Sequence, residues 1–180
     1  MRVIGGSHKG RRYSPSKKFT GRPTTDYARE SLFNVLMHGY ELDNIDVLDL
    51  FAGTGSLTYE FMSRGARTVL AVEKDRNSVK FINKTLQEFD LAGAEVIIGD
   101  VFSLLNRDIG TFDIVFADPP FDEPRLATLP ERLLKKSWLN PNGTLIVEHP
   151  PKMDFSEVEG FDRTRKYGNV YFSFFSQKDA

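Results

Sequence analysis

The sequence predicts an α/β fold built on a mostly parallel sheet with helices on both faces. Short apolar runs of strand length alternate with segments of helical periodicity along the 180 residues. The first run, residues 45–51, ends in an Ala-Gly-Thr-Gly turn at residues 52–55, where two glycines keep side chains away from the backbone. The last two runs meet at Gly168-Asn169, a hairpin signal that makes the final strand antiparallel.

The composition is that of one globular domain, with 40% hydrophobic and 27% charged residues. No apolar run reaches about 18 residues, so no membrane span is expected. The first residues do not resemble a signal peptide, which favours a cytoplasmic protein. There is no cysteine, which excludes disulfides and thiolate metal sites. We therefore expect a monomer without a metal.

The charge is unevenly distributed, although the net charge is only −1. Residues 1–25 contain seven bases and no acid, so the rest of the chain carries −8. Such an asymmetry indicates a negatively charged partner, and bases without acids nearby are expected to be free to meet phosphate. The candidate residues for contact with this partner are Arg2, Lys9, Arg11, Arg12, Lys17, Lys18 and Arg22.

Residues 1–21 are predicted to form a basic arm ahead of a single domain at residues 22–180. Val3, Ile4 and Tyr13 give this arm apolar surface to bury, which favours an ordered hairpin over a solvated tail.

The remaining elements follow from periodicity and from turn residues. Apolar spacing predicts a helix over residues 26–37, capped by Thr24 or Thr25. A second helix follows Gly55 and stops at Gly65. Further strands are expected at 68–72, 95–98, 112–117, 144–148, a segment ending at 167, and 170–175, with helices near 79–89, 101–106 and 126–136 and a turn at 140–143.

The glycine turn is not that of a dinucleotide-binding protein, because Thr58 stands where the third glycine would allow close helix–strand packing. The strand before the turn contains an acid, Asp49, which suits a ligand bearing a cation. A second acid, Glu73, ends the next strand and can hold both hydroxyls of a ribose. A ribose with a nearby cation describes S-adenosylmethionine (SAM).

The order of acid, glycine turn and second-strand acid resembles the motif of the class I SAM-dependent methyltransferases, which have a Rossmann-like, seven-stranded sheet. The resemblance implies that Asp100, also a candidate helix cap, contacts the adenine amino group and that Val101 or Phe102 flanks the ring. The expected cofactor-binding residues are Asp49, Phe51, Ala52, Gly53, Gly55, Glu73, Lys74, Asp100, Val101 and Asp118.

Residues 118–121, Asp-Pro-Pro-Phe, follow a predicted strand. The prolines fix the backbone and remove two donors, which leaves carbonyl oxygens and one carboxylate as acceptors. A planar base could donate its exocyclic amino group to Asp118 and the Pro119 carbonyl while Phe121 stacks on the ring. The segment resembles the motif of amino-methyltransferases acting on adenine, guanine or glutamine amides.

The three histidines, His8, His38 and His149, are expected at the surface.

Residues 22–34, Arg-Pro-Thr-Thr-Asp and then Arg-Glu-Ser-Leu-Phe-Asn after two residues, are similar to the entry of the RsmD family, bacterial enzymes that methylate guanine in small-subunit ribosomal RNA. This chain has Gly21 at a position where members of that family usually have threonine. The resemblance spans Arg2 to Tyr171. It implies methyl transfer from SAM to the N2 amino group of one guanine in 16S ribosomal RNA, either as naked RNA or in the small-subunit particle.

Three alternatives remain open. A DNA adenine-N6 or glutamine-N5 methyltransferase would share the motif, but such families usually carry extensions that 180 residues do not accommodate. A non-catalytic RNA-binding module could keep the same fold, although the intact Glu73 and Asp118 argue against it. An NAD(P) oxidoreductase is disfavoured by Thr58.

Overall fold

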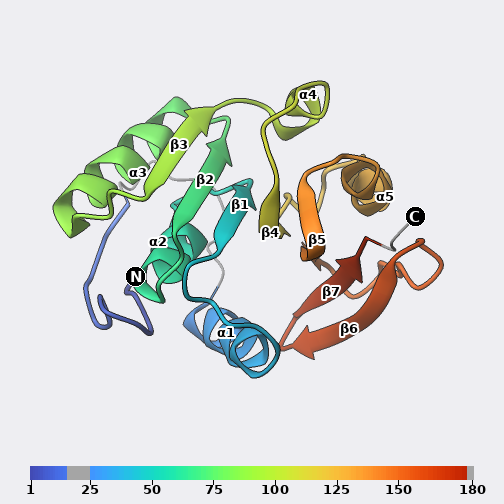
Figure 1. Cartoon of the computed structure of the whole chain (residues 1–180), viewed down its shortest axis with the longest axis horizontal. Coiled ribbons are helices and arrows are strands. Elements are labelled where there is room, and N and C mark those ends of the chain that lie inside the picture. Colours follow the sequence, from blue (N-terminus) through green and yellow to red (C-terminus); the bar gives the residue numbers. More distant parts are fainter. Residues whose placement is uncertain (16–24, 178–180) are drawn as a thin grey trace.

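The computed structural model describes residues 1–15 and 25–177, and these form a layered α/β domain (Figure 1). Seven strands make one sheet in the order β3-β2-β1-β4-β5-β7-β6. Strand β7 runs antiparallel to both β5 and β6, and the pairs among β1 to β5 are parallel, which confirms the predicted fold class. The strands are β1 Asp46–Leu50, β2 Thr68–Glu73, β3 Ala94–Ile98, β4 Phe112–Ala117, β5 Leu139–His149, β6 Phe161–Tyr167 and β7 Val170–Ser176.

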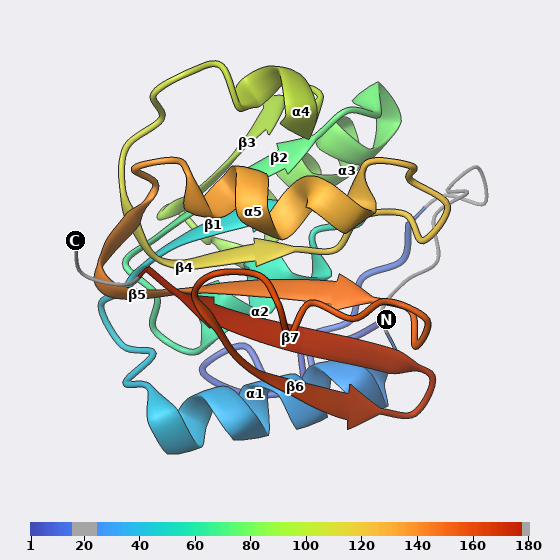
Figure 2. The same ribbon diagram turned by 90° about the vertical axis from the view of Figure 1, so that its right-hand side faces the viewer.

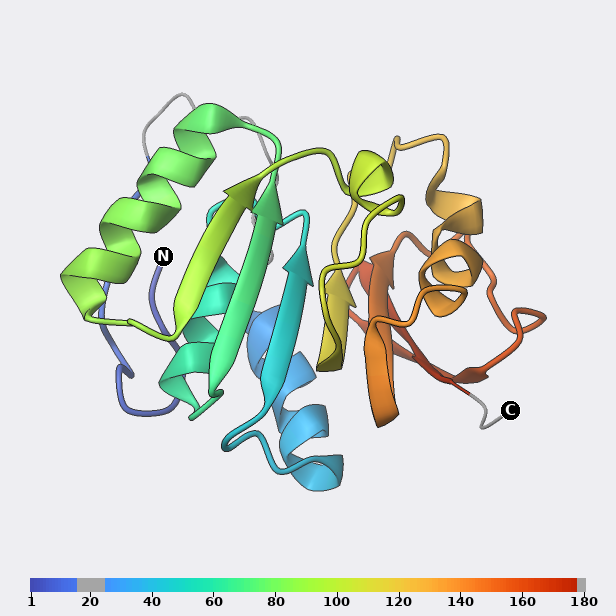
Figure 3. The ribbon, with the colours of Figure 1, turned by 45° about the horizontal axis from the view of Figure 1, so that its top comes forward.

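Helices cover both faces of the sheet (Figure 3). They are α1 Asp26–Gly39, α2 Ser56–Ser63, α3 Arg76–Phe89, α4 Val101–Leu104, the 3-10 turn Leu126–Thr128 and α5 Leu129–Leu134. Alternate residues of β4 face opposite layers, as the pleat of a strand requires. Ile114 and Phe116 belong to the core beneath α1 and α2, whereas Val115 and Ala117 belong to the core beneath α4 and α5.

Several strand boundaries differ from the prediction, and two of these differences change the local structure. Strand β1 ends at Leu50, and Phe51 turns out of it with a φ of +62°. Strand β5 begins at Leu139, so the expected turn at 140–143 lies within a strand. Phe112 pairs with Leu139, and the next pair joins Ile114 to Thr144. The turn residues therefore form a bulge, because four residues of β5 oppose one residue of β4.

The helix ends follow the predicted capping chemistry. Thr25 caps α1 through a 3.2 Å bond from the Ala28 amide, and Asp100 caps α4 through a 2.9 Å bond from the Ser103 amide. Gly55 precedes α2 with a φ of +78°, and a Cβ there would lie 2.6 Å from the Tyr59 hydroxyl. Only glycine meets both demands without displacing Tyr59.

Within residues 1–15 the arm is an ordered hairpin, as predicted. The Val3 amide donates to the Arg11 carbonyl at 3.0 Å, and Val3 and Tyr13 are buried. The buried carboxylate of Glu60 on α2 accepts from the Ile4 and Gly5 amides at 2.8 Å each. The hairpin is therefore held by helix α2 as well as by its own backbone hydrogen bonds.

A buried arginine also ties the arm to α1. Arg29 donates to the Tyr13 hydroxyl at 3.0 Å, to the Arg2 carbonyl at 3.1 Å and to the Asp26 carboxylate at 2.5 Å. Arg2 itself pairs with Asp26 at 3.3 Å. The expectation that the arm bases have no acid to pair with is therefore wrong for Arg2, because folding brings α1 beside the hairpin.

The other arm bases differ from one another. The Arg11 guanidinium lies 4.2 Å from the centre of the Phe89 ring and donates to the Glu88 carbonyl at 2.7 Å, so it is used in docking the arm on α3. Lys9 and Arg12 are exposed. The predicted contacts Lys17, Lys18 and Arg22, and the predicted boundary between residues 21 and 22, lie outside the described residues.

One histidine prediction is wrong. His149 is buried at the end of β5, with its Nε2 atom 2.7 Å from the Ser173 hydroxyl, because β7 covers it. Burial lowers its pKa. His38 is exposed and His8 is partly exposed. Among the described residues no helix is long and apolar enough to cross a membrane, and no cluster of three metal-ligating side chains occurs.

Candidate active site

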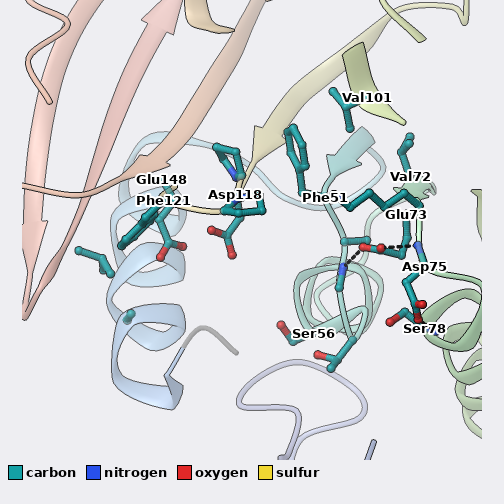
Figure 4. A pocket seen from close by; sticks show the side chains of 18 of the residues that line it. Phe51, Ser56, Val72, Glu73, Asp75, Ser78, Val101, Asp118, Phe121 and Glu148 are labelled. Carbon is teal, nitrogen blue, oxygen red and sulfur yellow. Dashed lines mark hydrogen bonds between the residues drawn. The ribbon is translucent and has the colours of Figure 1, made fainter. Parts of the chain in front are cut away.

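A cavity of ≈ 870 Å³ opens at the carboxyl ends of β1, β2, β4 and β5 (Figure 4). Parallel α/β sheets place their ligands at this edge, because the loops after several strands converge there. In the view of Figure 4, Glu73 lies on one side, Asp118, Phe121 and Glu148 lie on the other, and Phe51 stands between them. The cavity thus joins the two predicted half-sites in one space.

The Glu73 carboxylate is held by the backbone on both oxygens. It accepts from the Gly53 amide and from the Asp75 amide, at 2.8 Å each (Figure 4). Each carboxylate oxygen keeps a further lone pair that can accept a hydrogen bond from a hydroxyl group of a ligand. The glycine turn and the second-strand acid therefore form one unit, with the acid already oriented toward the cavity.

Asp49 lies behind this turn and does not line the cavity. Its buried carboxylate accepts a 2.5 Å bond from the Thr58 hydroxyl. Burial raises the pKa of Asp49 to about 7, and the nearby carboxylates of Asp118 and Glu73 add to the increase. Thr58, which stands where a dinucleotide-binding motif would have its third glycine, thus donates a hydrogen bond to Asp49.

The apolar walls come from the ends of β1 and β3. Phe51 and Val101 line the cavity. Phe102 is buried behind them, where its ring packs edge-on against Phe51 at a centroid distance of 6.0 Å and lies under the Arg125 guanidinium. Val101 and Phe102 are the two candidates for flanking an adenine ring. Val101 lines the cavity, whereas Phe102 packs behind Phe51 and does not line it.

The acceptor side of the cavity is formed by the loop after β4 and the end of β5. Asp118, Pro119 and Phe121 all line it. Ala117 pairs with Val147 in the sheet, so Asp118 and Glu148 are neighbours at the ends of adjacent strands. Figure 4 shows Asp118 and Glu148 at the same side of the cavity, and Glu148 is only 4% exposed.

Some residues of this wall were missed at the level of sequence. Glu148 was assigned only to a strand, although an acid at a strand end was the same signal that singled out Glu73. Tyr27 on α1 and Tyr167 at the β6–β7 turn also line the cavity. No local pattern reveals these two tyrosines, because only the packing of α1 beside β6 brings them together.

The predicted cofactor-binding residues fall into two groups. Most line the cavity, and Asp49 and Gly55 lie behind it. The group that lines it comprises Phe51, Ala52, Gly53, Glu73, Lys74, Asp100, Val101 and Asp118. None of the arm residues within 1–15 lines the cavity.

The chain is similar to known proteins over nearly its whole length. A family model described as "Conserved hypothetical protein 95" matches residues 1–176. The ribosomal RNA small subunit methyltransferase D of Escherichia coli K12 is 34% identical over 159 residues, covering 88% of this chain and 76% of that protein. Its Haemophilus influenzae counterpart is 35% identical over 152 residues, covering 82% and 78%.

Solved structures agree with these matches. The Escherichia coli protein yhhF superimposes with a TM-score of 0.85 and 30% identity, covering 100% of this chain and 99% of that one. A Thermus thermophilus protein superimposes with a TM-score of 0.86 and 26% identity, covering 98% and 99%. The fold, the glycine turn and the Asp-Pro-Pro-Phe loop at one cavity define a class I methyltransferase. Within that class, the chain belongs to the RsmD family.

Proposed function

We propose that the protein transfers a methyl group from SAM to the exocyclic N2 amino group of a guanine in 16S ribosomal RNA. The observation that supports this most directly is the single cavity that contains both Glu73 and the loop from Asp118 to Phe121. A methyl donor and a planar acceptor must meet in one space for in-line transfer. The names of the Escherichia coli and Haemophilus influenzae relatives support a ribosomal RNA acceptor.

The residues of the β1–β2 side suit the nucleoside part of SAM. Glu73 would accept from the ribose hydroxyls, with Gly53 and Asp75 holding it in place. Asp100 would accept from the adenine amino group, and Phe51 and Val101 would enclose the ring. Bound SAM supplies an electrophilic methyl carbon on a sulfonium centre.

The residues of the β4 loop suit the acceptor. An aryl amine is a weak nucleophile because its lone pair is delocalised into the ring. Hydrogen bonds from the amine to Asp118 and to the Pro119 carbonyl would aim that lone pair at the methyl carbon, and Glu148 adds a third acceptor beside them. Transfer would form the nitrogen–carbon bond as the carbon–sulfur bond breaks with its electron pair left on sulfur. The amine would then give up one proton to Asp118 or to water.

Positioning should supply most of the acceleration. Holding two reactants in the correct orientation can lower the activation barrier by roughly 7–11 kcal/mol. Asp118 would also stabilise the positive charge that develops on the amine nitrogen. Phe121 would hold the plane of the base by stacking. A base inside a duplex cannot reach such a cavity, so the guanine must be unpaired or flipped out of its stack.

Binding of the RNA backbone would use basic side chains that lie outside the cavity. Lys9 and Arg12 are exposed on the arm and can meet phosphates. Arg2 and Arg11 would contribute less, because their guanidinium groups already contact Asp26 and Phe89.

The proposal is tested by incubating the protein with methyl-labelled SAM and either 16S ribosomal RNA or small-subunit particles lacking the modification. The methylated nucleotide is then mapped by digestion and mass spectrometry. We expect one N2-methylguanine. Label on adenine, on DNA or on a protein would contradict the proposal, and so would binding of RNA without methyl transfer.

A further inference from the structure

We propose that the groove between α1 and β6 is a second RNA-binding site, which holds the phosphates of the strand next to the target base. This inference rests on the proposed function, because it assigns a path to the same RNA. It differs from the arm in place and in residues. The groove leads to the acceptor side of the cavity, whereas the arm docks on α2 and α3.

The groove is formed by one face of each element. Figure 2 shows α1 running beside the edge strand β6. From β6 come Arg163, Arg165 and Tyr167, which alternate along the strand and so point to the same side. From α1 come residues spaced by three or four, chiefly Ser31, Asn34 and His38.

The groove is continuous with the candidate active site at one end. Tyr167 lines both the groove and the cavity that contains Asp118. On α1, Tyr27 lines the cavity and lies one turn before Ser31, on the same stripe of the helix. Tyr27 is 65% exposed, so its ring is accessible to a ligand. A strand with one base in the cavity would therefore continue over two tyrosines into the groove.

The charges of the groove favour a polyanion. Two arginines line it, and no acid is among the described residues that do. Arg163 is ion-paired with Asp162 and lies 4.7 Å from the centre of the Phe174 ring, so it is largely used within the protein. Arg165 is exposed and makes no ion pair with the described residues. Its side chain is therefore the cation of the groove that is available to phosphate. Lys166 is also exposed, but it alternates with Arg165 along the strand and lies on the other side, 5.9 Å from the centre of the Tyr171 ring.

Stacking platforms beside cationic side chains are the combination with which proteins hold single-stranded nucleic acid. The polar residues Ser31 and Asn34 add neutral donors on the opposite wall. An acidic protein surface would use the cations but would not need exposed tyrosines at the cavity mouth. The groove therefore favours an RNA strand over a protein partner.

The first experiment measures RNA affinity against salt concentration, with 16S ribosomal RNA as the probe. The variant Arg165→Ala should bind more weakly, with a log–log salt slope smaller by roughly 0.7 to 0.9 units, the contribution of one phosphate contact. SAM affinity should not change. The matched control is Arg107→Ala, whose residue lies in the loop leading to the amino end of β4, opposite the cavity.

The second experiment locates the RNA directly. The chain has no cysteine, so Asn34→Cys in the groove and Arg107→Cys outside it each introduce a unique thiol for a photo-crosslinker. With small-subunit particles as the probe, we expect crosslinks from position 34 to nucleotides adjacent to the methylated guanine, and none there from position 107. Crosslinks from position 34 to a protein of the particle, or a salt slope of the Arg165 variant equal to that of wild type, would overturn the proposed role of the groove. Absence of methyl transfer by the wild type would instead overturn the proposed function, so the two failures are distinguishable.

Discussion

The Thr58 hydroxyl donates a 2.5 Å hydrogen bond to the buried carboxylate of Asp49, directly behind the glycine turn. Burial raises the pKa of Asp49 from its ordinary 3.8 to about 7. An unfolded chain ionises this acid above about pH 4, while the folded protein keeps it protonated until about pH 7. Its contribution to stability is therefore complete below pH 4 and is lost as the pH rises to 7.

Asp49→Asn should remove this loss. The free energy of unfolding of the variant relative to wild type should increase between about pH 4 and pH 7, by a few kcal/mol at most. Urea unfolding at several pH values measures the difference. Thr58→Val, which removes the donor, should extend the loss to higher pH. A stability difference that does not vary with pH would show that Asp49 titrates normally.

Glu73 is expected to carry much of the affinity for SAM. Glu73→Ala should weaken binding by roughly 1.5–3 kcal/mol, the range for a hydrogen bond to a charged group. Titration calorimetry gives the affinity directly. The control is Glu95→Ala, which removes an exposed acid of the neighbouring strand β3 that does not line the cavity. Equal affinities of the Glu73 variant and wild type would remove Glu73 from the site.

Asp118 is expected to act on transfer rather than on SAM binding. Asp118→Asn should lower the single-turnover rate by about 10²-fold or more, the cost of a small misplacement of the reacting groups. SAM affinity should remain close to that of wild type. The control is Asp108→Asn, which alters an exposed acid in the loop before β4 that does not line the cavity and should leave the rate nearly unchanged. A fast single turnover by the Asp118 variant would refute the proposed role.

The arm bases should separate into two kinds. Lys9→Ala/Arg12→Ala should reduce the salt slope of RNA binding by about 1.5 units, because both side chains are exposed. Arg11→Ala should change the slope less and should lower stability, since Arg11 docks the arm on Phe89 and the Glu88 carbonyl. Salt titrations and urea unfolding of the same variants separate the two effects. Salt slopes equal to that of wild type in all of these variants would show that residues 1–15 of the arm have only a structural role.

Glu60 should be essential for docking the arm. Its buried carboxylate serves two backbone amides of the hairpin and pairs with Arg64 at 2.8 Å. Glu60→Ala leaves these donors without an acceptor and should cost roughly 3–5 kcal/mol of the free energy of unfolding. The matched control is Glu131→Ala, which breaks an exposed pair with Lys135 and should have little effect. Comparable losses in the two variants would contradict the assignment.

The sequence by itself determined the order of the elements and the edge of the sheet that bears the site. Apolar runs locate the parallel strands, and the residues that follow a parallel strand lie at one edge of its sheet. This is why the sequence alone predicts that Glu73 and Asp118, separated by 45 positions in the chain, belong to one candidate site, and both line the same cavity. The hairpin signal at Gly168-Asn169 likewise made β7 antiparallel.

Only the tertiary structure decided which side chains face the cavity and which support it. Asp49 and Gly55 belong to the same motif as Gly53 but lie behind the cavity, because the turn directs them into the packing of α2. Tyr27 and Tyr167 meet only because α1 packs beside β6. Such contacts join segments far apart in the chain, and the free energy that selects them comes from burial across the whole domain, so no local pattern of residues encodes them.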